Sequence, residues 1–209
     1  MTEPVCRLTE IFTAQRNLMA KFHAIEAANG FRVESSIPVD LDDPHDQLRL
    51  KEFAWRVTEE IGETIVAMSH GTTSKKYREE VSDVLHFLVE MLIVAGITPS
   101  MIMQTSEGRL EKVFGMIRDI HGPDTVTEPL DSFWLYVIVA LTKAMNELKN
   151  RPWKQSRKPT NQTEFRHQMV HVFYQFISAC IASGLTADDL HEMYFKKNAV
   201  NQHRQASGV

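Results

Sequence analysis

Apolar residues recur at spacings of three and four along most of the chain, which is the period of an α-helix. Runs that alternate β-branched and polar residues between tight turns, the pattern of a strand, are nearly absent. The pattern therefore predicts an all-α fold, a helical bundle of about seven helices. We expect these helices at about residues 5–29, 44–69, 76–96, 98–119, 130–149, 163–183 and 186–205.

Segments rich in glycine, proline and small polar residues separate the predicted helices. The longest are GFRVESSIPVDLDDP, after the first helix, and NRPWKQSRKPTNQ, after the fifth. Thr98 precedes a proline in a first turn, and Thr186 precedes Asp188 and Asp189. Both threonines are therefore predicted N-caps.

A faint internal repeat relates DVLHFLVEMLIVAGITP, from Asp83, to HVFYQFISACIASGLTA, from His171. In both segments a helix, a glycine and a threonine follow in the same order. Two helical hairpins in a pseudo-symmetric bundle would give this pattern, with most of the acidic residues lost from the second copy. Helical hairpins that end in glycine also resemble one another without common origin, and the sequence leaves both interpretations open.

The composition is that of a globular protein, with 43% hydrophobic and 24% charged residues among 209. A chain of this length buries enough surface to fold without a metal or a disulfide. We therefore expect a single domain over residues 1–209, in which any bound metal serves chemistry. The formal net charge of −4 and the pI near 6.1 provide no basic surface for a nucleic acid.

Features of a secreted or membrane protein are also missing from the sequence. The N-terminus lacks a basic region followed by an apolar stretch, and no run of about 18 apolar residues occurs. Cys6 and Cys180 lie far apart and in no metal-binding or redox spacing, which indicates reduced thiols. We expect a cytoplasmic protein, in the host cytoplasm if a phage encodes it, with no membrane partner.

Two segments, WRVTEEIGETIVAM and YREEVSDVLHFLVEM, each place two acidic residues three apart on one helix face. Glu60 and Glu63 form the first pair, and Glu80 and Asp83 form the second. Both pairs flank apolar positions, so they point towards a helix interface rather than away from it. Four carboxylates can therefore meet between two antiparallel helices.

Burying four like charges needs a compensating cation, because one unpaired buried carboxylate costs on the order of several kcal/mol. Mg²⁺ prefers oxygen ligands and shares its coordination sphere with substrate phosphates, so it suits such a site. In the alternative, the acids are solvated and pair with the nearby cations Arg56, Lys75, Lys76 and Arg78. Spacing alone does not choose between the two.

Three segments of the chain resemble the all-α, dimeric dUTPases, a family related to MazG and the phosphoribosyl-ATP pyrophosphohydrolases. EEIGE at 59–63 and EEVSDVLHF at 79–87 match the ExxE and ExxD metal motif of that family. YFKKNAVNQHRQASG at 194–208 is similar to its C-terminal KNxxNxxRQ signature, and GLTADDLHEMYFKKNAVNQHRQ is similar to phage dCTPase/dUTPase enzymes. The three motifs, in this order, span most of the chain.

The resemblance implies a Mg²⁺-dependent homodimer that hydrolyses dUTP to dUMP and pyrophosphate. It makes Glu60, Glu63, Glu80 and Asp83 the metal ligands, and Lys197, Asn198, Asn201 and Arg204 the contacts to phosphates and sugar. The last three of these also recur at helical spacing, so one face presents amides and a guanidinium to polyphosphate oxygens. We expect Glu60, or its neighbour Glu59, to take a proton from the attacking water.

The base site departs from the family pattern. Gln15 stands where the family carries a glutamine for the base, but Met19 occupies the position of the second amide. The family's tryptophan-lysine segment appears only as RPWK at 151–154, so Trp153 is a candidate cover for the base. We interpret His86 and His171 as packing residues on helical core faces.

These departures keep two further hypotheses in view. The first retains the chemistry and changes the substrate to dCTP, a modified pyrimidine or a purine deoxynucleoside triphosphate. The second belongs to another class and is a non-catalytic helical adaptor or dimerisation module whose acids decorate the surface. Only the enzyme hypotheses predict Mg²⁺-dependent binding of a nucleotide.

Overall fold

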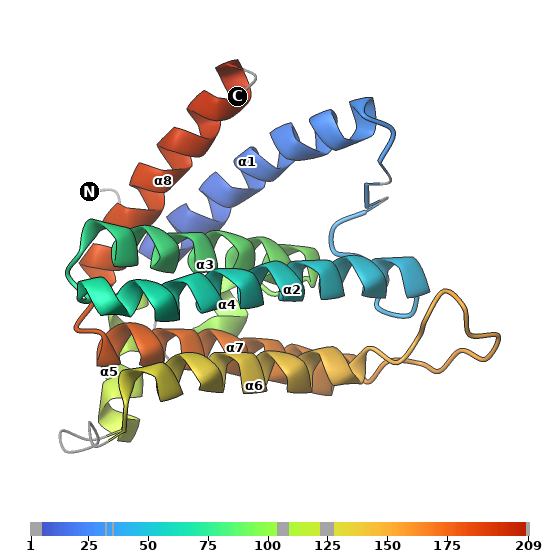
Figure 1. Cartoon of the computed structure of the whole chain (residues 1–209). Helices are drawn as coiled ribbons and strands as arrows, with labels where there is room; N and C mark the ends of the chain where they lie inside the picture. The colour runs from blue at the N-terminus through green and yellow to red at the C-terminus, as the bar shows by residue number, and fades with distance from the viewer. Residues whose placement is uncertain (1–5, 32, 35, 104–108, 122–127, 208–209) are drawn as a thin grey trace, which may run out of the picture.

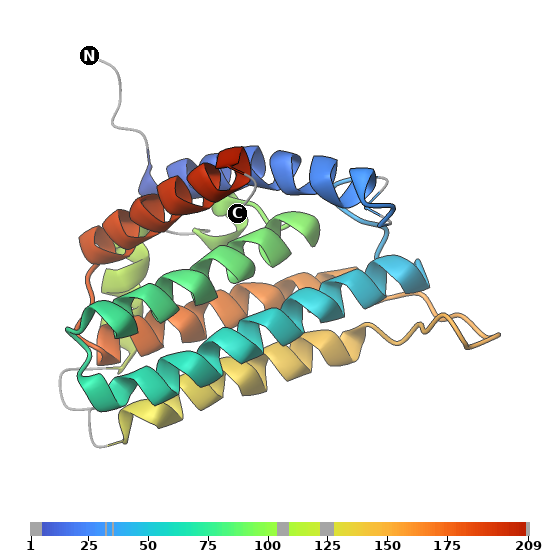
Figure 2. The same cartoon turned by 45° about the horizontal axis from the view of Figure 1, so that its top comes forward.

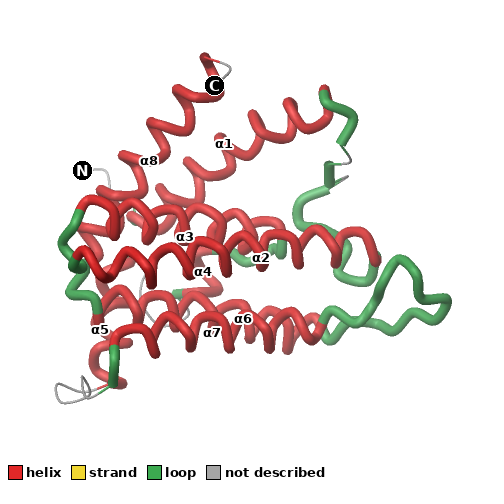
Figure 3. Tube along the Cα trace, viewed as in Figure 1, coloured by secondary structure: helices red, strands yellow, loops and turns green. Residues whose placement is uncertain are grey.

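The computed structural model describes residues 6–31, 33–34, 36–103, 109–121 and 128–207, and these ranges contain no strand. The all-α prediction is therefore confirmed (Figure 3). Within these ranges the chain forms eight α-helices and one 3₁₀ helix. Their bounds are α1 Arg7–Ala28, α2 Pro44–Ala67, η1 Met68–His70, α3 Lys75–Val94, α4 Pro99–Ile102, α5 Leu110–His121, α6 Leu130–Glu147, α7 Gln162–Ala182 and α8 Ala187–Ser207.

The single helix predicted at 98–119 is wrong, because two helices occupy that stretch. Helix α4 ends at Ile102, Met103 has φ −104° and ψ 26°, and α5 begins at Leu110. Residues 104–108 lie outside the described residues. The buried Met103 and Leu110 stand seven residues apart, which is two helical turns, so the apolar period continues across the break and does not reveal it.

Two antiparallel hairpins, α2–α3 and α6–α7, lie side by side and form the main layer of the bundle (Figures 1 and 2). A buried polar link joins them. The Tyr77 hydroxyl on α3 accepts a hydrogen bond from Trp134 Nε1 on α6 at 3.1 Å and also pairs with the Ser183 hydroxyl after α7. Phe176 packs edge-on against the same indole, with ring centroids 6.0 Å apart.

The second helix of each hairpin ends in the same way. Gly96 and Gly184 have φ of 78° and 80°, a region that favours glycine. The amide of the following residue then bonds back into the last turn, from Ile97 to the Leu92 carbonyl and from Leu185 to the Cys180 carbonyl. The faint sequence repeat corresponds, at these positions, to one kind of chain reversal used twice.

Helices α1 and α8 form a second layer that packs against α3 (Figures 1 and 2). Helix α3 therefore lies between the two layers, and every residue from Leu88 to Ala95 is buried. One of those residues, Glu90, is an acid. No single described helix has the length and hydropathy needed to cross a bilayer, although α7 and α8, bent by 106°, meet that criterion when taken as one pair.

Candidate active site

Three of the four predicted metal ligands converge between α2 and α3. Oxygen atoms of Glu60, Glu63 and Glu80 lie within 4.8 Å of one another. Three carboxylates at this separation repel one another strongly, and a divalent cation with oxygen ligands relieves that repulsion. The donor set of this cluster therefore fits Mg²⁺.

The electrostatics of the cluster agree with its geometry. The pKa of Glu60 is raised to about 7, first by burial and then by the charges of the other three carboxylates. Burial also raises the pKa of Glu80, and the charges of Glu63 and Asp83 act in the same direction. The acids thus resist carrying their full charge together, and a bound cation would relieve that resistance.

Asp83 takes a different partner from the other three acids. Its Oδ2 accepts a hydrogen bond from Lys197 Nζ on α8 at 2.6 Å, and both side chains are largely shielded from solvent. Burial raises the pKa of Asp83, while the Lys197 ammonium opposes that shift. The salt bridge ties the C-terminal motif to the acid motif on α3.

The cations that might have neutralised the acids at the surface instead pair with other carboxylates. Arg56 pairs with Glu59, Lys75 with Glu79, and Arg78 with Asp189 on α8. The remaining one, Lys76, lowers the pKa of Glu80 through its charge. The arrangement therefore favours a cation site over a set of solvated surface pairs.

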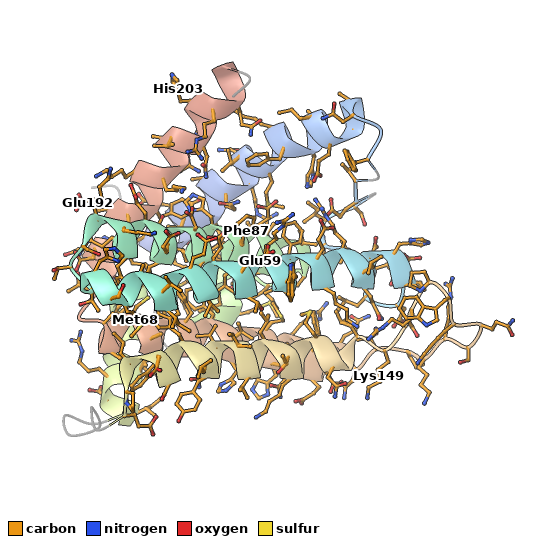
Figure 4. All side chains as sticks on the ribbon, viewed as in Figure 1. Glu59, Met68, Phe87, Lys149, Glu192 and His203 are labelled. Atoms are coloured by element: carbon orange, nitrogen blue, oxygen red, sulfur yellow. The ribbon has the colours of Figure 1, made fainter. Side chains whose placement is uncertain are left out.

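A pocket of about 270 Å³ opens beside the acids, where α1 and α8 meet α3. We call it the α1–α3–α8 pocket. Its lining combines acids, amides, cations and aromatic rings: Gln15, Leu18, Phe22, Glu60, Asp83, His86, Phe87, Glu90, Lys197, Asn201 and Arg204. Phe87 is labelled in Figure 4 between α3 and α1. A concave site with apolar walls and a few convergent polar groups is typical of a small-molecule site.

The C-terminal motif divides between the pocket and the helix interface. Lys197, Asn201 and Arg204, which the resemblance makes contacts to phosphates and sugar, line the pocket. Asn198 is buried instead, donating to the Tyr194 hydroxyl at 3.5 Å and accepting from Gln202 Nε2 at 2.7 Å. The structure therefore brings Asn198 to the packing of α8 rather than to the pocket wall.

Two other candidate residues are not brought to the pocket. Glu59 bonds to Trp55 Nε1 at 2.8 Å and to Arg56, and it does not line the pocket. Trp153 is 75% exposed on the loop that follows α6, at the end marked by Lys149 in Figure 4. Within this chain, neither side chain is positioned to touch a ligand beside the acids.

Gln15 lies in the middle of a chain of buried hydrogen bonds at the pocket wall. Its Nε2 donates to Glu90 Oε2 at 3.1 Å, and its Oε1 accepts from the Tyr194 hydroxyl at 2.8 Å. Met19 is 2% exposed and belongs to the core. Sequence reasoning missed Glu90 and Tyr194, although an acid inside the apolar run LVEMLIV was a signal of a buried polar group.

The two histidines interpreted as packing residues differ in the structure. His86 is 5% exposed and stacks on the Tyr194 ring, with centroids 4.3 Å apart, so its placement in the core is confirmed. His171 is exposed on α7, and that prediction is wrong. Its neighbours in the sequence, Val170, Val172 and Phe173, are all buried. The apolar spacing therefore did not show where the core face of α7 ends.

Comparison of the amino-acid sequence with known proteins identifies the family of the chain. A family model described as dUTPase matches residues 68–209, more than half of the chain. The chain belongs to this dUTPase family. The match includes Glu80, Asp83 and the C-terminal motif, while Glu60 and Glu63 lie before its first residue.

A dCTP pyrophosphatase of Enterobacteria phage LZ5 is also similar to this dUTPase-family protein. The two are 33% identical over 69 residues, which are 28% of this chain and 40% of the phage protein. The chain thus matches less than half the length of that relative. No solved structure matches the chain. The family identity confirms the resemblance to dUTPases.

Proposed function

We propose that this protein hydrolyses a pyrimidine deoxynucleoside triphosphate to the monophosphate and pyrophosphate in a Mg²⁺-dependent reaction. One observation carries the proposal: a cluster of carboxylates fit for a cation borders a pocket that Lys197 and Arg204 also line. The family supports dUTP as a substrate, and the phage relative supports dCTP as a second candidate.

In this proposal the acidic residues bind the metal and the basic residues bind the phosphates. Glu60, Glu63 and Glu80 would hold the metal, with Asp83 beside them. When bound, Mg²⁺ polarises the phosphate oxygens and lowers the pKa of water. Lys197 and Arg204, on the α8 side of the pocket, offset negative charge that grows on the phosphates during cleavage.

The proton from the attacking water goes to a carboxylate in this proposal. Glu60 is better placed than Glu59 to accept it, because Glu60 lines the pocket and Glu59 is engaged with Trp55 and Arg56 outside it. Attack at the α-phosphorus breaks the bond to the β-phosphate, so pyrophosphate leaves and the monophosphate remains. Removal of the proton makes the water a better nucleophile.

A screen of dUTP, dCTP, dTTP, dATP and dGTP, with Mg²⁺ and with EDTA, tests this function. We expect pyrophosphate release from a pyrimidine substrate in Mg²⁺ and none in EDTA. Release of orthophosphate rather than pyrophosphate would contradict cleavage at the α-phosphorus. No release from any nucleotide would support the adaptor hypothesis.

We also propose that the protein acts as a homodimer. Large apolar side chains remain exposed on two neighbouring helices, with Trp55 and Val66 on α2 and Leu135 and Val139 on α6. Exposed apolar surface of this kind is typical of a protein interface. Light scattering on the purified protein should give twice the mass of the chain, and a monomer at assay concentration would contradict this assembly.

A further inference from the structure

Two buried polar side chains on α3 line the α1–α3–α8 pocket and belong to neither the acid cluster nor the C-terminal motif. They are His86 and Glu90, which are 5% and 8% exposed and both line the pocket. Because they stand four residues apart in a helix, their side chains lie on the same face, with Cβ atoms roughly 5–6 Å apart. Buried polar groups in a pocket wall fix what a ligand must offer.

The structure sets His86 as a hydrogen-bond acceptor. Its Nδ1 lies 2.9 Å from the Ser82 carbonyl, which can only accept, so Nδ1 carries the hydrogen. Burial lowers the pKa of His86 to about 4, so the ring is neutral and Nε2 offers a lone pair. Among the described residues, Nε2 has no hydrogen-bond partner, and stacking on Tyr194 holds the ring in place.

Glu90 is held as a second acceptor. Gln15 Nε2 donates to its Oε2, and the orientation of the Gln15 amide is set by the hydrogen bond from Tyr194 to Oε1. A carboxylate can accept more than one hydrogen bond, so Glu90 retains capacity for a ligand. Burial raises the pKa of this carboxyl to about 7 and the charge of Arg49 opposes that shift, so the carboxylate form that only accepts prevails above about pH 7.

We propose that His86 and Glu90 read the base by accepting the two N–H groups of one exocyclic amino group, which selects dCTP over dUTP. This role requires two acceptor atoms that lie roughly 5 Å from each other, because each must be about 2.9 Å from one nitrogen and the two must be about 120° apart. That separation agrees with side chains one helical turn apart on the same face. The inference rests on the proposed function and narrows its substrate.

Uracil presents the wrong group to this pair. Its O4 is an acceptor where cytosine carries an amino group, so dUTP offers no donor to His86 Nε2 or to the Glu90 oxygen that Gln15 does not reach. Sites built around a buried hydrogen bond reject the analogue that lacks the partner much more strongly than apolar pockets discriminate by size.

The test compares dCTP with dUTP in two independent measurements. The first is the ratio of kcat/KM for dCTP to that for dUTP in Mg²⁺, which we expect to exceed about tenfold. The second is calorimetric binding of dCMP and dUMP in EDTA, which reports the base site without turnover. Equal values for the two bases, or a preference for uracil, would overturn the inference.

Two isosteric variants assign the selectivity to these residues. Glu90→Gln adds a donor to an acceptor site, and His86→Phe keeps a ring against Tyr194 while it removes Nε2. Each should lower the cytosine preference at least tenfold in both measurements. Glu164→Gln and His171→Phe make the same chemical changes on α7, away from the pocket, and should keep the wild-type ratio. Unchanged preference in both pocket variants would contradict the proposal.

The two proposals fail differently. If no nucleotide is hydrolysed but dCMP still binds better than dUMP, the proposed reaction is wrong and the proposed selection of cytosine by His86 and Glu90 is supported. If dUTP and dCTP are hydrolysed equally well, the proposed reaction is supported and the proposed selection of cytosine is wrong.

Discussion

The acidic residues of the candidate site differ from one another in the side chains that surround them. Glu60 meets two other acids, Asp83 meets Lys197, and Glu90 meets an amide. Three acids that look alike in the sequence therefore have three distinct environments. The differences lie in what the neighbouring helices bring to each acid.

The substitution Glu60→Gln tests the acid cluster at the residue scale. We expect at least a 100-fold loss of kcat, comparable to the loss of one preorganised electrostatic contact in other enzymes. Folding should persist, because the substitution removes one of several repelling charges. Pyrophosphate release and thermal unfolding measure the two effects. Glu52→Gln, two turns nearer the N-terminus of α2, is the matched control. Near-normal turnover in Glu60→Gln would contradict the proposed site.

Glu90→Gln tests the burial of a carboxyl in the core. Burial raises the pKa of Glu90 from 4.5 to about 7, and the charges of Glu26 and Glu34 add to this while Arg49 opposes it. The pKa of Glu90 is higher in the folded state than in the unfolded chain. The contribution of this carboxyl to the free energy of unfolding is therefore fully present below about pH 4.5 and is lost as the pH rises through about 7. The glutamine variant should therefore be more stable than the wild type at pH 8, by up to about 3 kcal/mol.

At pH 5 the two proteins should differ little, because Glu90 is then mostly protonated in the folded state. Urea unfolding at both pH values measures the difference. A stability difference that does not change with pH would contradict the raised pKa of Glu90. A variant that gains stability and loses cytosine preference would show that this acid is retained for function.

Between the helices, one buried side chain fastens the long loop to the start of α2. The Asn150 side chain donates to the carbonyls of Asp42 and Lys158, at 2.9 and 3.0 Å, and accepts from the Lys158 amide at 2.9 Å. Its backbone amide donates to Gln47 Oε1 at 2.8 Å. These hydrogen bonds of Asn150 connect the end of α6 with the N-terminus of α2.

The substitution Asn150→Ala should lower the free energy of unfolding by about 2–3 kcal/mol, because it leaves buried backbone groups without partners. Chemical denaturation measures that loss. Gln155→Ala, in the exposed part of the same loop, should change stability by less than about 0.5 kcal/mol. Equal effects of the two substitutions would mean that Asn150 does not fasten the loop.

The whole molecule positions the pocket at the junction of its two layers. Helices α1 and α8 supply Gln15, Lys197 and Arg204, while α2 and α3 supply the acids. A nucleotide bound there contacts both layers and binds only the folded chain. Binding must therefore stabilise the folded state as a unit.

The predicted consequence is a nucleotide- and Mg²⁺-dependent rise in unfolding temperature. At a ligand concentration about 100 times Kd, the stabilisation is about 2.7 kcal/mol. For a chain of this size, each kcal/mol raises Tm by roughly 2–4 °C. A slowly hydrolysed dCTP analogue with Mg²⁺ should produce this shift, and Mg²⁺ with sulfate serves as the control. Identical unfolding temperatures in the two samples would favour the non-catalytic adaptor.

The sequence by itself determined most of the helices and the helix faces on which the acids lie. Periodicity located most of the helices, and Thr186 accepts the Asp189 amide at 3.1 Å as the cap pattern predicted. Glu60 and Glu80 could be assigned to interface-facing helical positions, because local spacing fixes which side chains share a face. These are properties of one helix at a time.

Only the tertiary structure decided which faces meet. It joined Asp83 to Lys197, buried Asn198 in the packing of α8, and left Trp153 in solvent. It also brought Glu90 to Gln15 across 75 residues of sequence. The orientation of one helix against another depends on packing between side chains distant in the chain, and the pattern within a single helix does not contain that information.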